Sequence, residues 1–211
     1  MLFGDAPFEQ LIAGIIALLV GLTFHEFSHA YVADQLGDHR PRAMGRVTLN
    51  PIPHIDPIGA LLLLVAGFGW AKPVMVNAAA LRNGRAGLAM VAAAGPIANL
   101  SLAVVFAIVF RVLGQFDVGL GTFVGMTIFW VVVFNVVLAI FNLLPIPPLD
   151  GYNVALAFVP PRQAMFMRQY GTYGIFILLV LVLLSSMNSP IDPLGWILGF
   201  ARDLARLLLG V

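Results

Sequence analysis

Four long apolar stretches divide the chain, over residues 9–35, 86–110, 119–144 and 171–187. Each is close to or above the roughly 20 apolar residues with which a helix crosses the hydrocarbon core of a membrane. The second and third stretches contain no Asp, Glu, Lys or Arg. The pattern therefore predicts an all-α, polytopic membrane protein with at least four transmembrane helices.

Two shorter apolar segments leave the predicted number of transmembrane helices between four and six. Residues 58–71 are short for a complete crossing, and their length favours a re-entrant or buried helix. Residues 196–209 carry Arg202, Asp203 and Arg206 on one helical face. An interfacial amphipathic helix therefore fits this tail as well as a further transmembrane helix does.

The segment WAKPVMVN, residues 70–77, predicts a short extended stretch. Pro73 has no backbone N–H, which limits this stretch to the edge of a sheet. Such an edge can hold a peptide as an added strand. We expect a small membrane-associated β edge here, which could stabilise a substrate helix after it has unwound.

Composition agrees with the membrane class and narrows the possible chemistry. Of 211 residues, 61% are hydrophobic and 10% are charged, whereas soluble domains carry about 25% charged residues. There is no cysteine, so a metal site would have to use His, Asp or Glu. A net charge of +1 without a basic cluster argues against a nucleic-acid surface.

The first ten residues contain no Lys or Arg and so lack the basic region that begins a signal peptide. We therefore expect the first apolar stretch to be retained in the mature protein. No hydrophilic stretch is long enough to form a second, soluble domain. We expect residues 1–211 to form a single membrane domain.

The basic residues between the apolar stretches predict an orientation. If residues 58–71 dip into the membrane and return, all the basic groups fall on one side, which the positive-inside rule places in the cytoplasm. These groups are Arg40, Arg42 and Arg46; Lys72, Arg82 and Arg85; and Arg162 and Arg168. The N-terminus would then lie outside. The cytoplasmic ends of the first and third stretches would lie at one depth.

Residues 25–29 read His-Glu-Phe-Ser-His, an H-E-x-x-H pattern. Histidines four apart on a helix share a face, so both imidazoles can reach one metal ion. Zn²⁺ binds imidazole nitrogen and keeps a position open in catalytic sites, where Glu26 could take a proton from an activated water. Ionisable groups inside a membrane are costly and point to function, so this cluster indicates a metal site.

Asp150 is the candidate third ligand. It lies in NLLPIPPLDG, residues 142–151, where three prolines end a helix and Gly151 permits a turn. On the pattern alone, an ordinary turn after a membrane helix fits equally well. The depth shared with His29 favours a ligand.

The two motifs together resemble the site-2 protease family of zinc intramembrane metalloproteases. That family combines H-E-x-x-H with N-x-x-P-x-x-P-L-D-G on a later helix, and both are present in order. The resemblance implies that His25, His29 and Asp150 bind one Zn²⁺ and that Glu26 is the catalytic base. It also implies cleavage of substrates within or close to a transmembrane segment.

Three further polar residues are candidates with alternative interpretations. Asn99 lies in AGPIAN, residues 94–99, which resembles a family signature. Asn99 could bind substrate or ligand, or it could satisfy backbone groups freed by Pro96. Asn142 could orient Asp150 or cap its helix. His54, in NPIPHIDPIG, could be a fourth ligand in a resting state, a proton donor to the leaving amine, or a solvated loop histidine.

The chain resembles the compact prokaryotic branch of the family, because no PDZ-like or CBS segment is evident. We predict a zinc-dependent intramembrane endopeptidase in the prokaryotic cell membrane, with its site towards the cytoplasm. Its partners would be a transmembrane protein or peptide substrate and the lipid bilayer, while the oligomeric state is left open. The alternatives are a membrane metal or proton transporter, which would need ionisable groups along a path, and a non-catalytic relative that binds a membrane partner.

Overall fold

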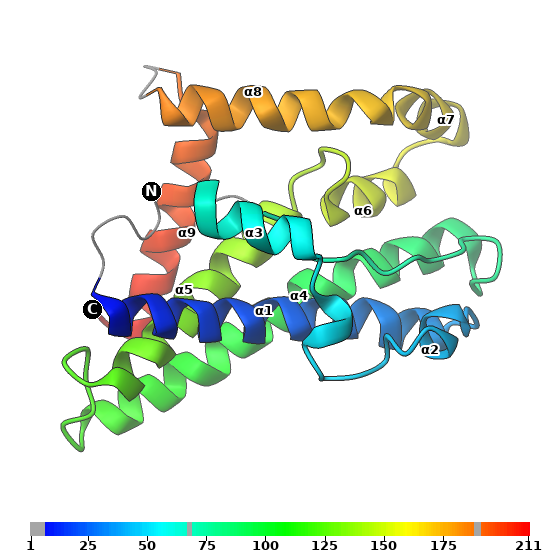
Figure 1. Cartoon of the computed structure of the whole chain (residues 1–211). Coiled ribbons are helices and arrows are strands. Elements are labelled where there is room, and N and C mark those ends of the chain that lie inside the picture. The colour runs from blue at the N-terminus through cyan, green and yellow to red at the C-terminus, as the bar shows by residue number, and fades with distance from the viewer. Residues whose placement is uncertain (1–6, 67–68, 188–190) are drawn as a thin grey trace.

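A computed structural model describes residues 7–66, 69–187 and 191–211. Three long helices pack against one another: α1 (Phe8–Gln35), α4 (Gly84–Gly114) and α5 (Phe123–Asn142) (Figure 1). The shorter elements are α2 (Arg40–Ala43), η1 (Ile52–His54), α3 (Pro57–Ala66), α6 (Asp150–Phe158), α7 (Pro161–Tyr170), η2 (Gly171–Tyr173), α8 (Gly174–Ser186) and α9 (Pro193–Leu209). The predicted all-α fold is confirmed.

Four helical stretches are long and apolar enough to cross a membrane: α1, α4, α5 and the run Pro161–Ser186 that joins α7, η2 and α8. They match the four predicted stretches, with shifted ends. The third begins at Phe123 instead of residue 119 because Thr122 caps it, its hydroxyl oxygen accepting the Gly125 N–H at 3.0 Å. The second extends to Gly114 and includes Arg111.

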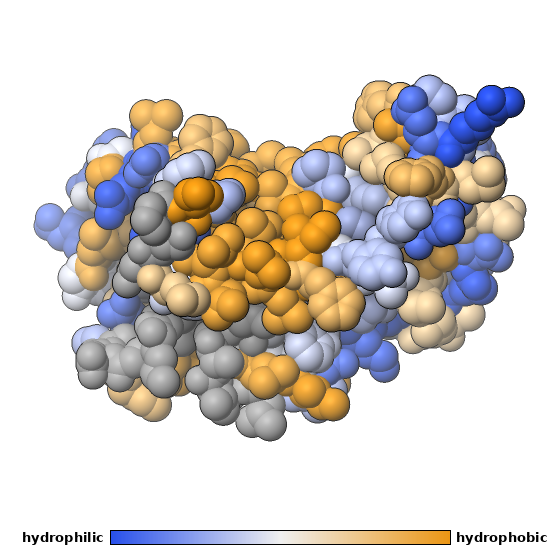
Figure 2. All heavy atoms as spheres, turned by 90° about the horizontal axis from the view of Figure 1, so that it is seen from above, coloured by the Kyte–Doolittle hydropathy of each residue, from blue (hydrophilic) through white to orange (hydrophobic). Residues whose placement is uncertain are grey.

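The surface agrees with an integral membrane protein. Figure 2 shows a broad apolar band on one face, with hydrophilic residues concentrated towards the two ends. Helix α8 contributes exposed Phe176, Leu179, Val180 and Leu183 to the apolar surface. Exposed side chains of this kind are suited to lipid tails and would be costly in water.

The short apolar segment around α3 returns to the place where it began. Lys72 donates its N–H to the His54 carbonyl at 2.9 Å, and Ile55 and Ala71 form an antiparallel bridge. The ten residues of α3 rise about 15 Å, half of the hydrocarbon core. These contacts favour the re-entrant interpretation, although residues 67–68 lie outside the described part. In the described ranges the bridge is isolated and belongs to no sheet, so the β edge is at most an extended segment.

Helix α9 lies across the bundle. In Figure 1 it runs roughly perpendicular to α1, and it packs on α5 and α4. Ala201 and Ala205 are buried, whereas Arg202, Asp203 and Arg206 are exposed. This orientation favours the interfacial interpretation of the tail over a further span.

One apolar core joins α4, α5 and α9 at the end of the molecule where α4 finishes. We call it the apolar core; its buried members are Ala103, Ala107, Phe110, Ile128, Val132, Val133, Val136, Ala201, Ala205 and Leu209. The many alanines allow the three helices to approach closely, as small residues do in membrane bundles. Buried polar side chains lie next to this core, at Asn99 near the middle of α4 and at Asn135 between Val133 and Val136 of α5.

Candidate metal centre

The polar residues of α1 form a buried face in its last third. His25, Glu26 and His29 are all buried, and the two imidazoles stack edge to face with ring centroids 4.6 Å apart. Their spacing of four residues places them on one side of the helix, as the sequence predicts. This face turns towards α4, which packs against α1.

Asp150 reaches the same place from the other side. Helix α5 ends at Asn142, and the proline-rich segment leads to α6, which packs on α4. Asp150 is the first residue of α6, so the predicted turn at Gly151 is wrong. Gly151 lies inside the helix, and a side chain there would collide with the carbonyls of Leu143 and Leu144.

The three predicted ligands come together. Asp150 Oδ2 lies 3.0 Å from His25 Nε2 and 3.2 Å from His29 Nε2, and the two Nε2 atoms are 3.0 Å apart. Within the described ranges, His25, His29 and Asp150 form the group of His, Asp and Glu side chains whose ligand atoms lie close enough together to hold one metal ion. Ligands arranged tetrahedrally about 2.0–2.1 Å from one zinc ion lie about 3.3–3.4 Å from one another, close to these separations.

Hydrogen bonds on the far side of each ring explain why this group suits a cation. His25 Nδ1 donates to Asn99 Oδ1 at 2.6 Å, and His29 Nδ1 donates to the Val91 carbonyl at 2.7 Å. In a neutral imidazole the other nitrogen then bears a lone pair. Three acceptors therefore face one another, and Asp150 Oδ2 is buried without a hydrogen-bond donor. A metal cation resolves this repulsion, and the donor set fits zinc.

Gly95 on α4 makes room for the ligands. A Cβ atom at this position would lie 2.5 Å from His29 Nε2 and 2.6 Å from His25 Cε1. Both rings are held from behind by hydrogen bonds, so they have little freedom to retreat. In the sequence, Gly95 stands out only as part of the AGPIAN motif; the signal that could have identified its role is a glycine on a helix that also carries a candidate site residue, Asn99.

Asn99 makes a hydrogen bond to the proposed ligand His25 and does not face an open cavity. It is fully buried, its Oδ1 contacts His25, and its Nδ2 donates to the Gly21 carbonyl at 3.0 Å and to Asn135 Oδ1 at 2.7 Å. These contacts agree with a role behind the ligands and leave no free group for substrate. Asn135 was missed in the sequence; a lone amide in an apolar membrane helix is the signal that points to it.

Glu26 is paired with a buried arginine. Its Oε2 lies 3.5 Å from a terminal nitrogen of Arg46, and both residues are less than a tenth exposed. Arg46 also donates to the carbonyls of Pro53, at 2.6 Å, and Lys72. Burial lowers the pKa of Arg46, and the charge of Glu26 partly opposes this. Arg46, counted in the sequence only as a loop charge, thus ties the ends of the re-entrant segment to Glu26.

Two other candidates lie outside the ligand group. His54 is buried, its Nε2 donates to the Thr48 carbonyl at 2.9 Å, and its Nδ1 has no partner. The structure does not bring it into the metal cluster, and its role as a proton donor stays a prediction. Asn142 donates to the Leu138 carbonyl of its own helix at 2.9 Å and makes no hydrogen bond to Asp150.

The loop that follows α1 is fixed by two charge clusters beyond the metal ligands. Asp34, near the end of α1, accepts from Arg42 at 2.7 Å and from His39 at 2.9 Å. Asp38 accepts from Arg40 at 2.8 Å and from the Asn77 N–H at 2.6 Å. The Arg40 hydrogen bond, with help from Asn77, lowers the pKa of Asp38 to about 2 despite burial.

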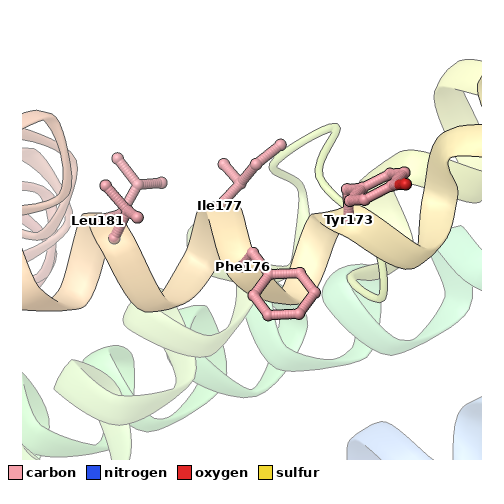
Figure 3. Close-up of a pocket in the computed structure, with 5 residues that line it drawn as sticks. Tyr173, Phe176, Ile177 and Leu181 are labelled. Carbon is pink, nitrogen blue, oxygen red and sulfur yellow. The ribbon is translucent and has the colours of Figure 1, made fainter.

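A separate hollow lies on α8. It is lined by Tyr173, Phe176, Ile177, Val180 and Leu181, and Figure 3 shows Ile177 and Leu181 projecting from the same side of the helix. The lining is apolar except for the Tyr173 hydroxyl. No member belongs to the metal cluster, so the hollow carries no chemistry for the site.

Comparison with known proteins gives consistent relatives. The profile of Peptidase family M50 matches residues 120–185. "Putative zinc metalloprotease YwhC" of Bacillus subtilis is 44% identical over 175 residues, covering 79% of this chain and 78% of that protein. "Putative zinc metalloprotease Rip2" of Mycobacterium tuberculosis H37Rv is 31% identical over 198 residues, covering 91% and 71%. No solved structure matches.

Proposed function

Since this chain belongs to peptidase family M50 and is a zinc metalloendopeptidase of the site-2 protease type, we propose that it cleaves peptide bonds within or near transmembrane segments. The observation that carries this proposal is the convergence of His25, His29 and Asp150 between helices long enough to span a membrane. A substrate that reaches such a site must come from the bilayer or its interface.

We assign the zinc ligands to His25, His29 and Asp150 and the general base to Glu26. When bound, zinc acts as a Lewis acid that polarises an oxygen ligand and makes water easier to deprotonate. Glu26 follows His25 directly in the sequence and has its own counter-charge in Arg46. It would accept the proton of the attacking water and pass it to the leaving nitrogen.

The proposed membrane orientation places the site towards the cytoplasm. The basic loops after α1, before α4 and around α7 share one end of the molecule, and the re-entrant course of α3 lets them do so (Figure 1). By the positive-inside rule that end is cytoplasmic. The prokaryotic cell membrane is the corresponding location.

The extended segment over residues 70–77 is the proposed binding site for unwound substrate. Among the described hydrogen bonds, none uses the backbone N–H groups of Val74 to Val76. The segment is joined at Lys72 to Arg46, and through Arg46 to Glu26. Proline at Val74 and Val76 should slow cleavage of a helical substrate, whereas alanine at both positions, which keeps the N–H groups, should not. Equal cleavage by the two variants would contradict this role.

One experiment tests the main proposal. The full chain, Glu26→Gln and Asp150→Ala are purified, their zinc content is measured, and cleavage of a model transmembrane peptide is followed. We expect one zinc per chain in the first two, cleavage lowered at least 10²-fold in Glu26→Gln, and zinc lost from Asp150→Ala. Equal cleavage by wild type and Glu26→Gln would exclude the assigned base, and full zinc in Asp150→Ala would exclude that ligand.

The rival functions are less well supported. A metal or proton transporter needs ionisable groups along a path, but residues 86–110 and 119–144 contain no Asp, Glu, Lys, Arg or His. A non-catalytic relative would be expected to lack Glu26 or a ligand, and all four residues are present.

A further inference from the structure

Behind the metal ligands, three helices are joined by a chain of side-chain amides. Asn99 on α4 contacts His25 on α1, and Asn135 on α5 contacts Asn99 at 2.7 Å. Asn135 in turn donates from Nδ2 to the Val131 carbonyl at 2.8 Å. Both asparagines are fully buried, so their hydrogen-bonding groups depend on one another and not on bulk water.

The direction of every hydrogen bond in this series of amides follows from the last one, between Asn135 and the Val131 carbonyl. The Val131 carbonyl can only accept, so Asn135 must present its NH2 group there and its Oδ1 towards Asn99. Asn99 then uses both hydrogens of Nδ2, one to Asn135 and one to the Gly21 carbonyl. Its Oδ1 is left to face His25 and accepts the hydrogen on Nδ1.

From this chain we propose that Asn135 is a positioning residue, which fixes the amide of Asn99 and through it the tautomer of His25. The inference rests on the proposed function of His25 as a zinc ligand. With hydrogen on Nδ1, the Nε2 atom of a neutral His25 carries a lone pair directed at the ligand group. Without Asn135, one hydrogen of the Asn99 amide loses its acceptor, and only the Gly21 carbonyl still opposes the turned-over amide, which presents NH2 to His25. That favours hydrogen on Nε2, which cannot bind zinc.

His29 shows why the hydrogen-bonded asparagines are needed behind His25 and not behind both ligands. His29 Nδ1 donates to the backbone carbonyl of Val91 at 2.7 Å. A carbonyl within a helix cannot turn over, so the tautomer of His29 is fixed without further support. His25 has a side-chain amide as its partner, and an amide has two opposite orientations. Asn135 and the Gly21 carbonyl together remove this ambiguity.

The test measures zinc affinity, using zinc alone with a competing chelator, on the detergent-solubilised full chain. The variants are Asn135→Leu, of similar size but without hydrogen bonds, and Asn135→Asp, whose neutral carboxyl offers the same acceptor and donor. Thr127→Val is the matched control, because Thr127 only donates to the Phe123 carbonyl of the same helix. We expect zinc binding to weaken about 10-fold in Asn135→Leu, at the low end of effects for residues behind metal ligands. Asn135→Asp and Thr127→Val should stay within about threefold of wild type.

A second measurement separates positioning from simple helix packing. Nitrogen-15 NMR of the metal-free protein reports which nitrogen of His25 carries hydrogen. We expect Nδ1 in wild type and a mixture in Asn135→Leu. Hydrogen on Nε2 in wild type overturns the inference even if Asn135→Leu fails to fold.

The outcomes also separate this inference from the proposed function. Unchanged zinc affinity in folded Asn135→Leu, with zinc lost from Asp150→Ala, would remove the role of Asn135 alone. Retention of zinc by both Asp150→Ala and His25→Ala would remove the proposed metal site itself.

Discussion

Helix α4 is built differently in its two halves. Towards the end of α4, Ala103, Ala107 and Phe110 pack on valines of α5 and on α9 in the apolar core. Towards the metal site, α4 presents Gly95 and Asn99, and α5 adds Asn135, which lies between the core residues Val133 and Val136. The apolar core needs volume and close contact, whereas the metal-site half needs particular atoms at particular places. Substitutions should therefore change stability in one half and metal binding in the other.

Arg46 lies outside both halves, in the loop after α2, and gives the largest expected effect on stability because its charge is buried. Arg46→Met leaves Glu26 without its counter-charge and the carbonyls of Pro53 and Lys72 without a donor. Breaking a buried pair costs about 3–5 kcal/mol. Arg202→Met, at an exposed position of α9, should change the free energy of unfolding by less than about 0.5 kcal/mol. Reversible unfolding in detergent measures both, and similar values would contradict the importance of the buried charge.

Substitution of Gly95 should weaken zinc binding strongly and leave the packing of the apolar core unchanged. In Gly95→Ala the added methyl group meets both ligand rings, and overpacking of this kind costs about 1–3 kcal/mol. Zinc should bind roughly 5- to 150-fold more weakly, as chelator competition can measure. The control is Gly114→Ala on the same helix, where nothing lies within 4 Å of the added atom. Equal zinc affinities for the two variants would show that the ligand rings can move aside.

Much of the fold follows from apolar length. The four long stretches became the four membrane-length helices, because about 20 apolar residues leave few other structures in a bilayer. The course of residues 58–71 depends on contacts between Lys72 and His54, which lie far apart in the sequence. Hydropathy cannot reveal such a contact, so the sequence left the number of helices open.

The ligand group was predictable and its surroundings were not. His25 and His29 follow from helical spacing, and Asp150 was placed by shared depth together with the family motif. Asn135 and Gly95 act across helix interfaces, and nothing in their local sequence specifies which atoms they meet. Gly151 shows the same limit: it was read as a turn, but close packing against the Leu143 carbonyl explains the glycine.

Substitution of Val132, in the apolar core, should lower stability without weakening zinc binding, the opposite of the result expected for Gly95. It is fully buried, so Val132→Ala removes two methyl carbons and leaves a cavity between α4, α5 and α9. We expect the free energy of unfolding to fall by about 1–2 kcal/mol, less than the 2–5 kcal/mol typical of larger deletions. Zinc affinity should stay within twofold of wild type. A clear loss of zinc binding in a folded Val132→Ala protein would mean that the two halves are coupled.

Asp38 gives the smallest expected effect on the free energy of unfolding. Its effect depends on pH, unlike that of the hydrophobic residues in the apolar core. Its pKa is about 2 in the folded protein and 3.8 ordinarily, owing first to the hydrogen bond from Arg40. A depressed pKa contributes stability that is fully present above about pH 4 and is lost as the pH falls towards 2. The metal-free wild type should therefore be more stable than Asp38→Asn at pH 5, and this gap should close near pH 2. Other acids titrate in both proteins and cancel in the difference. A gap that stays constant from pH 5 to pH 2 would mean that Asp38 contributes through shape and not through charge.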